Sequence, residues 1–182
     1  MIHATAQIHP SAEIDPTVDI GPYTIIAAGV KIGPHTRLWA HVNILADVVI
    51  GAWCSIGAGS EVGRGTTIGD RTRIGSQVFL PANTQIGKWV FIGPQVGCSD
   101  DRTPRVPAPT DPHYTAEPPV IEDASSIGLG AKLCPGIRIG MGARVALGAI
   151  VTHDVAPSEK VRSHGVAARA FETSDAAKAG GW

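Results

Sequence analysis

The chain has 182 residues, which is enough length for one domain with a sizeable core, and its net charge is −1. Its charges form no long basic or acidic run, which argues against nucleic acid or a membrane surface as the main partner. The sequence has no apolar stretch of about 18 residues that would span a membrane, and residues 1–4 lack the basic and apolar regions of a signal peptide. Its three cysteines lie far apart and are expected to be reduced thiols. We therefore expect a cytoplasmic protein.

A hexapeptide repeat begins near the N-terminus. Every sixth residue from Ile8 to Ile92 is Ile, Leu or Val, at fifteen successive positions. A small or β-branched residue stands two places before each of them, and glycine often follows directly, as at Gly51 and Gly57. After a break, the pattern resumes at Ile121. The 22 glycines and 14 prolines, beside 43% hydrophobic residues, indicate many turns around a real core.

The period of six predicts short strands, because it is even and therefore keeps the aliphatic residues on one face of a strand. The recurrent glycine is expected to mark a bend with positive φ. A strand and a bend every six residues close a three-sided coil of 18 residues with the aliphatic side chains inside. The twenty-one hexads predict an all-β parallel β-helix of about seven coils, roughly 34 Å long at the usual strand spacing.

The repeat is interrupted at residues 99–119, which contain six prolines. From Cys98 to Ile121 is 23 residues, which is not a multiple of six, so a loop is predicted to leave the prism here. Loops on rigid scaffolds often carry function, and the alternative is a surface excursion or a clasp between subunits. We therefore expect a β-helix at residues 1–157 with an inserted loop at 99–119. The C-terminal segment, 158–182, is expected to be partly helical, with a short helix at 167–179.

A coil of 18 residues predicts three columns of outward side chains. The columns are His41, Gly59, Gln77 and Gln95; Asp47, Gly65, Asn83 and Asp101; and His35, Trp53, Arg71 and Trp89. Asn83 and Asp101 would be neighbours at the start of the loop. The arginine between two tryptophans predicts stacking, either as a structural feature or at a subunit interface.

The repeat resembles that of the hexapeptide-repeat acyltransferase superfamily, whose coils are left-handed. Residues 91–94, 99–105 and 36–39 are similar to the Phe-x-Gly-Pro, Thr-Asn-Asp-x-x-Pro-Arg and Arg-x-Trp motifs of sugar-nucleotide 3-amino N-acetyltransferases. Residues 135–140, 151–155 and 165–169 resemble the shared ending of the superfamily. The resemblance covers about residues 8–170. Gln77 and Asp100 stand where the family usually has Asn.

This resemblance implies a homotrimer that moves an acetyl group from acetyl-CoA to the amino group of a nucleotide-linked amino sugar in surface-polysaccharide biosynthesis. An amine needs a carboxylate or amide oxygen to orient it rather than a strong base, and the loop motif lacks the histidine of related O-acetyltransferases. Asp101 with Asn83 is therefore the favoured catalytic pair, and Gln77 with His41 is the second choice. The substrate-binding candidates are Trp39, Asp100, Arg102, Arg105, His113 and Tyr114, and the candidates for binding acetyl-CoA are Gly148, Ala149, Lys160 and Arg169.

Other interpretations of the sequence remain open. The acceptor could instead be serine, a small amine or a lipid precursor, or the β-helix could be a non-enzymatic binding or assembly module. Arg102 and Arg105 could form an internal pair with Asp100 or Asp111 instead of binding a diphosphate. A zinc site of three histidines is disfavoured, because no two histidines are five residues apart, as they are in the related carbonic anhydrases.

Overall fold

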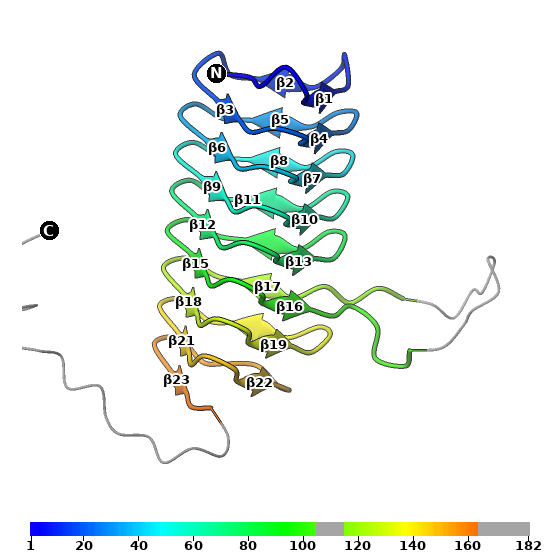
Figure 1. Cartoon of the computed structure of the whole chain (residues 1–182). Helices are drawn as coiled ribbons and strands as arrows, with labels where there is room; N and C mark the ends of the chain where they lie inside the picture. The colour runs from blue at the N-terminus through cyan, green and yellow to red at the C-terminus, as the bar shows by residue number, and fades with distance from the viewer. Residues whose placement is uncertain (105–114, 164–182) are drawn as a thin grey trace, which may run out of the picture.

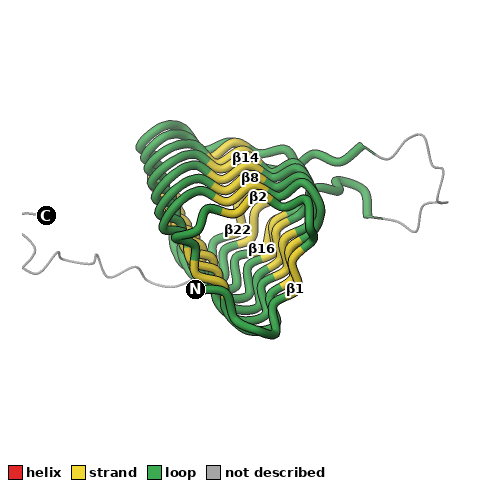
Figure 2. The backbone as a smooth tube through the Cα atoms, turned by 90° about the horizontal axis from the view of Figure 1, so that it is seen from above, coloured by secondary structure: helices red, strands yellow, loops and turns green. Residues whose placement is uncertain are grey.

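Two-residue strands wind around one axis as a three-sided prism in the computed structural model, which describes residues 1–104 and 115–163 (Figures 1 and 2). This confirms the predicted all-β left-handed parallel β-helix. The predicted C-terminal helix lies outside the described residues.

Each side of the prism is a parallel sheet. Sheet 1 contains β1 (Gln7–Ile8), β4 (Ile25–Ile26), β7 (Asn43–Ile44), β10 (Glu61–Val62), β13 (Phe79–Leu80), β16 (Gly97–Cys98), β19 (Lys132–Leu133) and β22 (Ile150–Val151). Sheet 2 contains β2 (Glu13–Ile14), β5 (Lys31–Ile32), β8 (Val49–Ile50), β11 (Thr67–Ile68), β14 (Gln85–Ile86), β17 (Val120–Ile121) and β20 (Arg138–Ile139). Sheet 3 contains β3 (Asp19–Ile20), β6 (Arg37–Leu38), β9 (Ser55–Ile56), β12 (Arg73–Ile74), β15 (Phe91–Ile92), β18 (Ser126–Ile127), β21 (Arg144–Val145) and β23 (Lys160–Val161).

The core lies inside the prism, as the repeat predicts. The second residue of nearly every strand points inward and is buried, and it pairs with its equivalent 18 residues later, as Ile26 does with Ile44. The inserted loop leaves between β16 and β17 (Figure 1). Two strands come in addition to the predicted hexads. In β16 the inward position is Cys98, and β23 lies past the predicted end of the β-helix at residue 157.

The glycines that directly follow the aliphatic residues do not have the positive φ that we expected, so this prediction was wrong. Positive φ occurs two residues later, for example at Gly59, where φ is 70°. The first glycine is needed because successive coils approach closely there. A Cβ on Gly57 would lie 2.4 Å from the carbonyl carbon of Gly75 and from the nitrogen of Ser76.

The residues with positive φ form the three corners of the prism, and they include every member of the predicted columns except Asp101. The first corner, from sheet 3 to sheet 1, contains Tyr23, His41, Gly59, Gln77, Gln95, Gly130 and Gly148. The second corner, from sheet 1 to sheet 2, contains Gly29, Asp47, Gly65, Asn83 and Gly136. The third corner, from sheet 2 to sheet 3, contains His35, Trp53, Arg71, Trp89, Ala124, Gly142 and Ser158. Backbone hydrogen bonds tie each corner to the previous coil, such as the 2.9 Å bond from the Gln77 amide to the Ala58 carbonyl.

Buried hydroxyl groups also join successive coils. The Thr72 hydroxyl donates to the Gly87 carbonyl at 2.9 Å and accepts from the Val90 amide at 3.1 Å. Ser60 makes the same two kinds of bond. These small polar residues therefore form hydrogen bonds with buried backbone groups that are not paired between strands.

Replacing Thr72 by valine should lower the free energy of unfolding by about 2–4 kcal/mol, because both backbone partners lose their hydrogen bond in a buried place. Urea unfolding measures this loss. Thr67→Val is the matched control, since Thr67 points outward from sheet 2 and is exposed. Equal stability of the two variants would contradict this account of the buried hydroxyls.

Candidate functional site

The inserted loop is closed at its base by contacts between its two ends. The Glu117 amide donates to the Asp100 carbonyl at 2.8 Å, and the Gly136 amide donates to the Glu117 carbonyl at 2.6 Å. The Arg102 guanidinium donates to the Glu117 carboxylate at 2.7 Å. The loop therefore begins from a fixed neck beside the second corner. Arg102 makes an internal ion pair, as the alternative interpretation expected, but its partner is Glu117 and not Asp100 or Asp111.

Asp101 lies in this neck, three residues before the last residue of its described part. One carboxylate oxygen accepts a hydrogen bond from the Thr103 amide at 2.8 Å, and within the described residues the other oxygen has no hydrogen bond. The pairing of β13 with β16 sets Asp101 one coil after Asn83. However, no hydrogen bond joins these two described residues, and the Asn83 side chain lies against Gly65 of the coil before. Their joint action on an amine stays a prediction.

The second-choice pair, Gln77 and His41, shares the first corner without sharing a site. The His41 ring stacks on Tyr23 with the centroids 5.1 Å apart, in the direction away from the loop. Gly59 separates His41 from Gln77 by one further coil. Gln77 instead contacts the next coil, where the Gln95 amide nitrogen donates to its side-chain oxygen at 3.1 Å.

Trp39 lies far from the loop within one chain. Its indole nitrogen donates to the Ser55 hydroxyl at 3.2 Å, and the Arg37 guanidinium is 5.6 Å from its ring centroid. It follows β6, whereas Asp101 follows β16, which is more than three coils or roughly 16 Å along the axis at the usual strand spacing. The remaining substrate candidates Arg105, His113 and Tyr114 lie outside the described residues.

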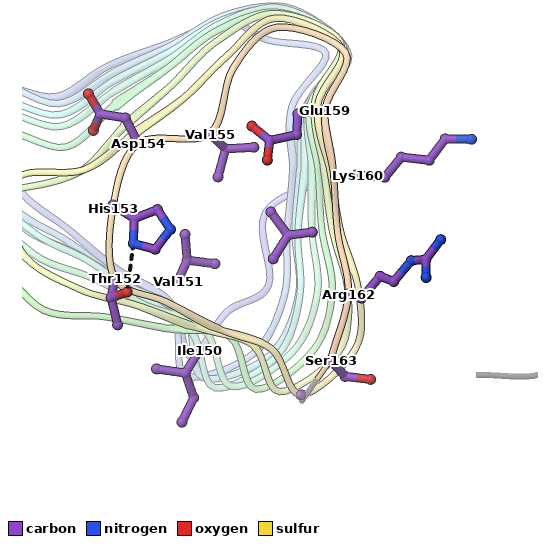
Figure 3. A pocket seen from close by; sticks show the side chains of 12 residues that line it. Ile150, Val151, Thr152, His153, Asp154, Val155, Glu159, Lys160, Arg162 and Ser163 are labelled. Atoms are coloured by element: carbon purple, nitrogen blue, oxygen red, sulfur yellow. Dashed lines mark hydrogen bonds between the residues drawn. The ribbon is translucent and has the colours of Figure 1, made fainter. Parts of the chain in front are cut away.

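The predicted cofactor residues meet at the C-terminal end of the prism. A cavity of about 700 Å³ there is lined by Gly148 and Lys160 together with a cation that sequence reasoning missed, Arg162. Figure 3 shows Lys160 and Arg162 extending outward on one side, while His153 and Glu159 point into the coil. The signal for Arg162 was its two-residue spacing from Lys160, which places both side chains on one face of an extended segment.

The backbone amides that we predicted to hold the cofactor already have partners. The Gly148 amide donates to the Leu129 carbonyl at 2.8 Å, and the Ala149 amide donates to the Ala146 carbonyl at 3.3 Å. Ala149 is fully buried. The surface at Gly148 is open, because this residue has no side chain and a Cβ there would meet nothing within 4 Å. A ligand could therefore approach the backbone of this corner closely. Arg169, the fourth cofactor candidate, lies outside the described residues.

A cluster of three cations marks this end of sheet 3. Arg144 pairs in register with Lys160 on the neighbouring strand, and Arg162 follows two residues later. Among the ion pairs of residues 1–104 and 115–163, none involves these three side chains. Asp154 and Glu159 line the same cavity, where Glu159 accepts a hydrogen bond from the Ala156 amide. Three neighbouring cations that make no ion pair within the described residues suit a ligand with several phosphates.

Cys98, directly before the loop, is the thiol closest in sequence to the predicted catalytic residues. Burial raises its pKa to about 12. Since the thiolate is the nucleophilic form, this thiol is unsuited to carry an acyl group at neutral pH. Cys98 is therefore not expected to form an acyl-enzyme intermediate.

Aromatic and cationic side chains stack along the third corner, as predicted. His35 stacks on Trp53 with the centroids 4.1 Å apart, and the Arg71 guanidinium lies 4.6 Å from the Trp89 centroid. In the described ranges, no group of three or more His, Cys, Asp or Glu residues could hold a metal ion, and no helix is long and apolar enough to cross a membrane.

Comparisons with known proteins place the chain among hexapeptide-repeat proteins. Residues 1–96 match the family model described as the GMPPB C-terminal domain, and residues 118–153 match the model described as the hexapeptide repeat of succinyl-transferase. A 41-residue stretch is 54% identical to the 2,3,4,5-tetrahydropyridine-2,6-dicarboxylate N-acetyltransferase of Staphylococcus aureus strain JH9. That stretch spans 22% of this chain and only 17% of the relative.

Two solved structures share the fold over most of the chain. A UDP-N-acetylglucosamine acyltransferase from Bacteroides fragilis 9343 superposes with a TM-score of 0.69 at 21% identity, covering 88% of this chain and 70% of that one. A UDP-N-acetylglucosamine O-acyltransferase from Moraxella catarrhalis RH4 gives a TM-score of 0.61 at 22% identity, covering 88% and 66%. These superpositions establish the shared β-helix fold. At such low identity they do not establish a shared reaction, which has to be inferred from the residues of the site.

Proposed function

Because the chain belongs to the GMPPB C-terminal domain family and has the left-handed β-helix of hexapeptide-repeat proteins, we propose that it transfers an acetyl group from acetyl-CoA to an amine. The observation that carries the proposal is the cluster of Arg144, Lys160 and Arg162, of which Lys160 and Arg162 line the C-terminal cavity. CoA carries a 3′-phosphate and a diphosphate, which match these cations. The local identity to a curated N-acetyltransferase supports the same type of reaction.

The donor would lie along the first corner, from the cationic cluster toward the loop. Gly130 and Gly148 leave this corner without side chains for two coils, and a Cβ on either would meet nothing within 4 Å. The exposed side chains of Leu129 and Leu147 flank the two glycines and suit the thin, partly apolar pantetheine arm. The thioester would then arrive near Gln95, one coil before Gly130.

The proposed acceptor is the amino group of a nucleotide-linked amino sugar. The loop motif at residues 99–105 supports this class. Asp101 supplies a carboxylate at the neck, and a neutral amine needs an acceptor for its N–H rather than a strong base. The amine nitrogen would form a bond to the acetyl carbon, the carbon–sulfur bond would break, and the proton lost by the amine would end on the departing CoA thiolate.

We further propose that the active unit is a homotrimer. Gln95, near which the thioester would lie, and Asp101 flank β16 at opposite corners. Six residues of extended chain span roughly 20 Å, so one chain does not bring the thioester and the Asp101 carboxylate to the same amine. Sheet 1, between these corners, exposes Ile25, Phe79 and Ile150. A closed ring of three copies would bury this apolar face at its axis and set the second corner of one copy beside the first corner of the next.

A panel of acceptors tests the proposed activity. The release of CoA from acetyl-CoA should be stimulated by a nucleotide-linked amino sugar, and less by serine, by a simple amine or by 2,3,4,5-tetrahydropyridine-2,6-dicarboxylate. Stimulation by that dicarboxylate alone would keep the reaction type and replace the acceptor. Release with none of them, together with no binding of CoA, would favour a non-enzymatic binding or assembly module. The match of residues 1–96 to a model that describes a domain supports that second candidate.

The cationic cluster should control the affinity for CoA. The double variant Lys160→Gln, Arg162→Gln is expected to weaken CoA binding about 10- to 100-fold, because two charge-assisted contacts to phosphate are lost. Calorimetry at several salt concentrations measures this, and the difference should shrink as salt rises. Lys31→Gln is the control, since Lys31 pairs with Glu13 near the other end of the prism. Unchanged affinity in the double variant would place the donor elsewhere.

A further inference from the structure

The first corner carries a chain of side-chain hydrogen bonds in the coils before and after the inserted loop. The Gln95 amide nitrogen donates to the Gln77 oxygen at 3.1 Å. The Lys132 ammonium donates to the Gln95 backbone carbonyl at 3.1 Å. These three residues come from three successive coils, so the bonds run parallel to the axis of the prism.

Gly97 makes room for this arrangement. It occupies the outward position of β16, where every other strand of sheet 1 has a side chain. A Cβ on Gly97 would lie 3.2 Å from the Lys132 ammonium nitrogen and 3.3 Å from its Cδ. The Lys132 side chain therefore lies across Gly97, and this places its ammonium group at the corner, where it remains exposed.

The direction of the bond between the two amides decides which of them can serve an amine. The Gln77 oxygen already accepts one hydrogen bond, which leaves it a single lone pair beside the Gln95 nitrogen. Gln95 uses its nitrogen and keeps its own oxygen available among the hydrogen bonds of the described residues. From the sequence, Gln77 with His41 was the second choice after Asp101 with Asn83, and Gln95 was not a candidate. The hydrogen bond between the two amides directs our proposal to Gln95.

We propose that Gln95 is the residue whose side-chain oxygen accepts a hydrogen bond from the acceptor amine, and that Gln77 and Lys132 are positioning residues that fix it. The inference rests on the proposed acetyl transfer. Gln95 stays neutral throughout, because an amide oxygen orients the amine without taking its proton. Lys132 fixes the backbone of the corner, and Gln77 prevents the Gln95 amide from turning its nitrogen toward the substrate.

The test compares steady-state kinetics of four variants with the parent. Gln95→Met keeps the length of the side chain and removes both polar atoms, and we expect kcat to fall about 100-fold while the KM for acetyl-CoA stays unchanged. Gln77→Met should lower kcat about 10-fold, since the Gln95 amide is then free to rotate. Gln77→Glu should restore it, because a carboxylate still accepts the Gln95 nitrogen. Gln85→Met is the matched control, an exposed glutamine on sheet 2.

Two results would overturn the inference. One is a Gln95→Met enzyme as active as the Gln85→Met control, and the other is a Gln77→Glu enzyme as impaired as Gln77→Met. A parent enzyme that releases no CoA with any amine would instead remove the proposed function, and with it this role for Gln95. Thermal unfolding of each variant shows whether a loss of kcat comes from a loss of folded protein.

Discussion

Replacing Asp101 by alanine is expected to lower the turnover of acetyl transfer about 100- to 10,000-fold, the usual range for losing a group that handles a proton in the transition state. The carboxylate would orient the amine and stabilise the positive charge that forms on its nitrogen. Stability should change little, because the folded chain loses only the 2.8 Å bond from the Thr103 amide. Steady-state kinetics and thermal unfolding of the same preparation measure both effects.

Asp101→Asn separates the carboxylate charge from the shape of the loop neck. Asparagine keeps an oxygen for the Thr103 amide and removes the negative charge. If the charge acts in the reaction, asparagine should be nearly as impaired as alanine. An active Asp101→Asn enzyme beside an inactive Asp101→Ala enzyme would mean that the residue only shapes the neck.

Mixed trimers test whether the two corners act in different copies. Neither Asp101→Ala nor Gln95→Met should be active alone. When they are unfolded and refolded together, about a quarter of the sites in randomly mixed trimers should combine an intact Gln95 with an intact Asp101 from the next copy. Activity near a quarter of the parent supports sites shared between copies, and no recovery would place both residues in one chain or in separate roles.

The second large effect is expected for Gly57→Ala, which should lower the free energy of unfolding by about 3 kcal/mol or more. The added Cβ would lie 2.4 Å from backbone atoms of Gly75 and Ser76, and these cannot move without separating two coils. Gly59→Ala is the matched control, because Gly59 has a positive φ but its nearest obstacle is Gln77 Cγ at 3.6 Å. That variant should lose only about 1 kcal/mol.

Urea unfolding ranks the two glycine variants. The order matters more than the values, since it distinguishes close approach of the backbone from the φ angle as the reason for glycine after each aliphatic residue. If Gly59→Ala is the more destabilising of the two, then the close approach of successive coils is not the reason for glycine after each aliphatic residue.

The fold could be predicted from the sequence because the repeat is uniform. Aliphatic residues at every sixth position dictate one inward face, and a change in any single hexad leaves the others to set the register. The predicted columns follow for the same reason, and the exception is Asp101, which lacks the positive φ of the corner residues where the loop interrupts the repeat. The conformation of the glycines was not predictable in this way, because the contact that Gly57 makes involves Gly75 in the next coil and leaves no trace within its own hexad.

The site was only partly predictable. Gly148 and Lys160 do line one cavity, since the period places them at the last coils. Arg102 was assigned to a diphosphate and instead pairs with Glu117, because the loop breaks the period and its neck folds by contacts between distant residues. The choice between Gln77 and Gln95 depended on the direction of one side-chain bond, which spacing alone does not determine.

The central claim is that this β-helix transfers an acetyl group from CoA to nitrogen. The most direct measurement is ¹³C NMR of the protein incubated with acetyl-CoA labelled at the acetyl carbonyl and a nucleotide-linked amino sugar. We predict that the thioester resonance disappears, that an amide resonance appears, and that this requires both the enzyme and the amine. A new ester resonance, or a thioester signal that persists at the rate seen without enzyme, would contradict the claim.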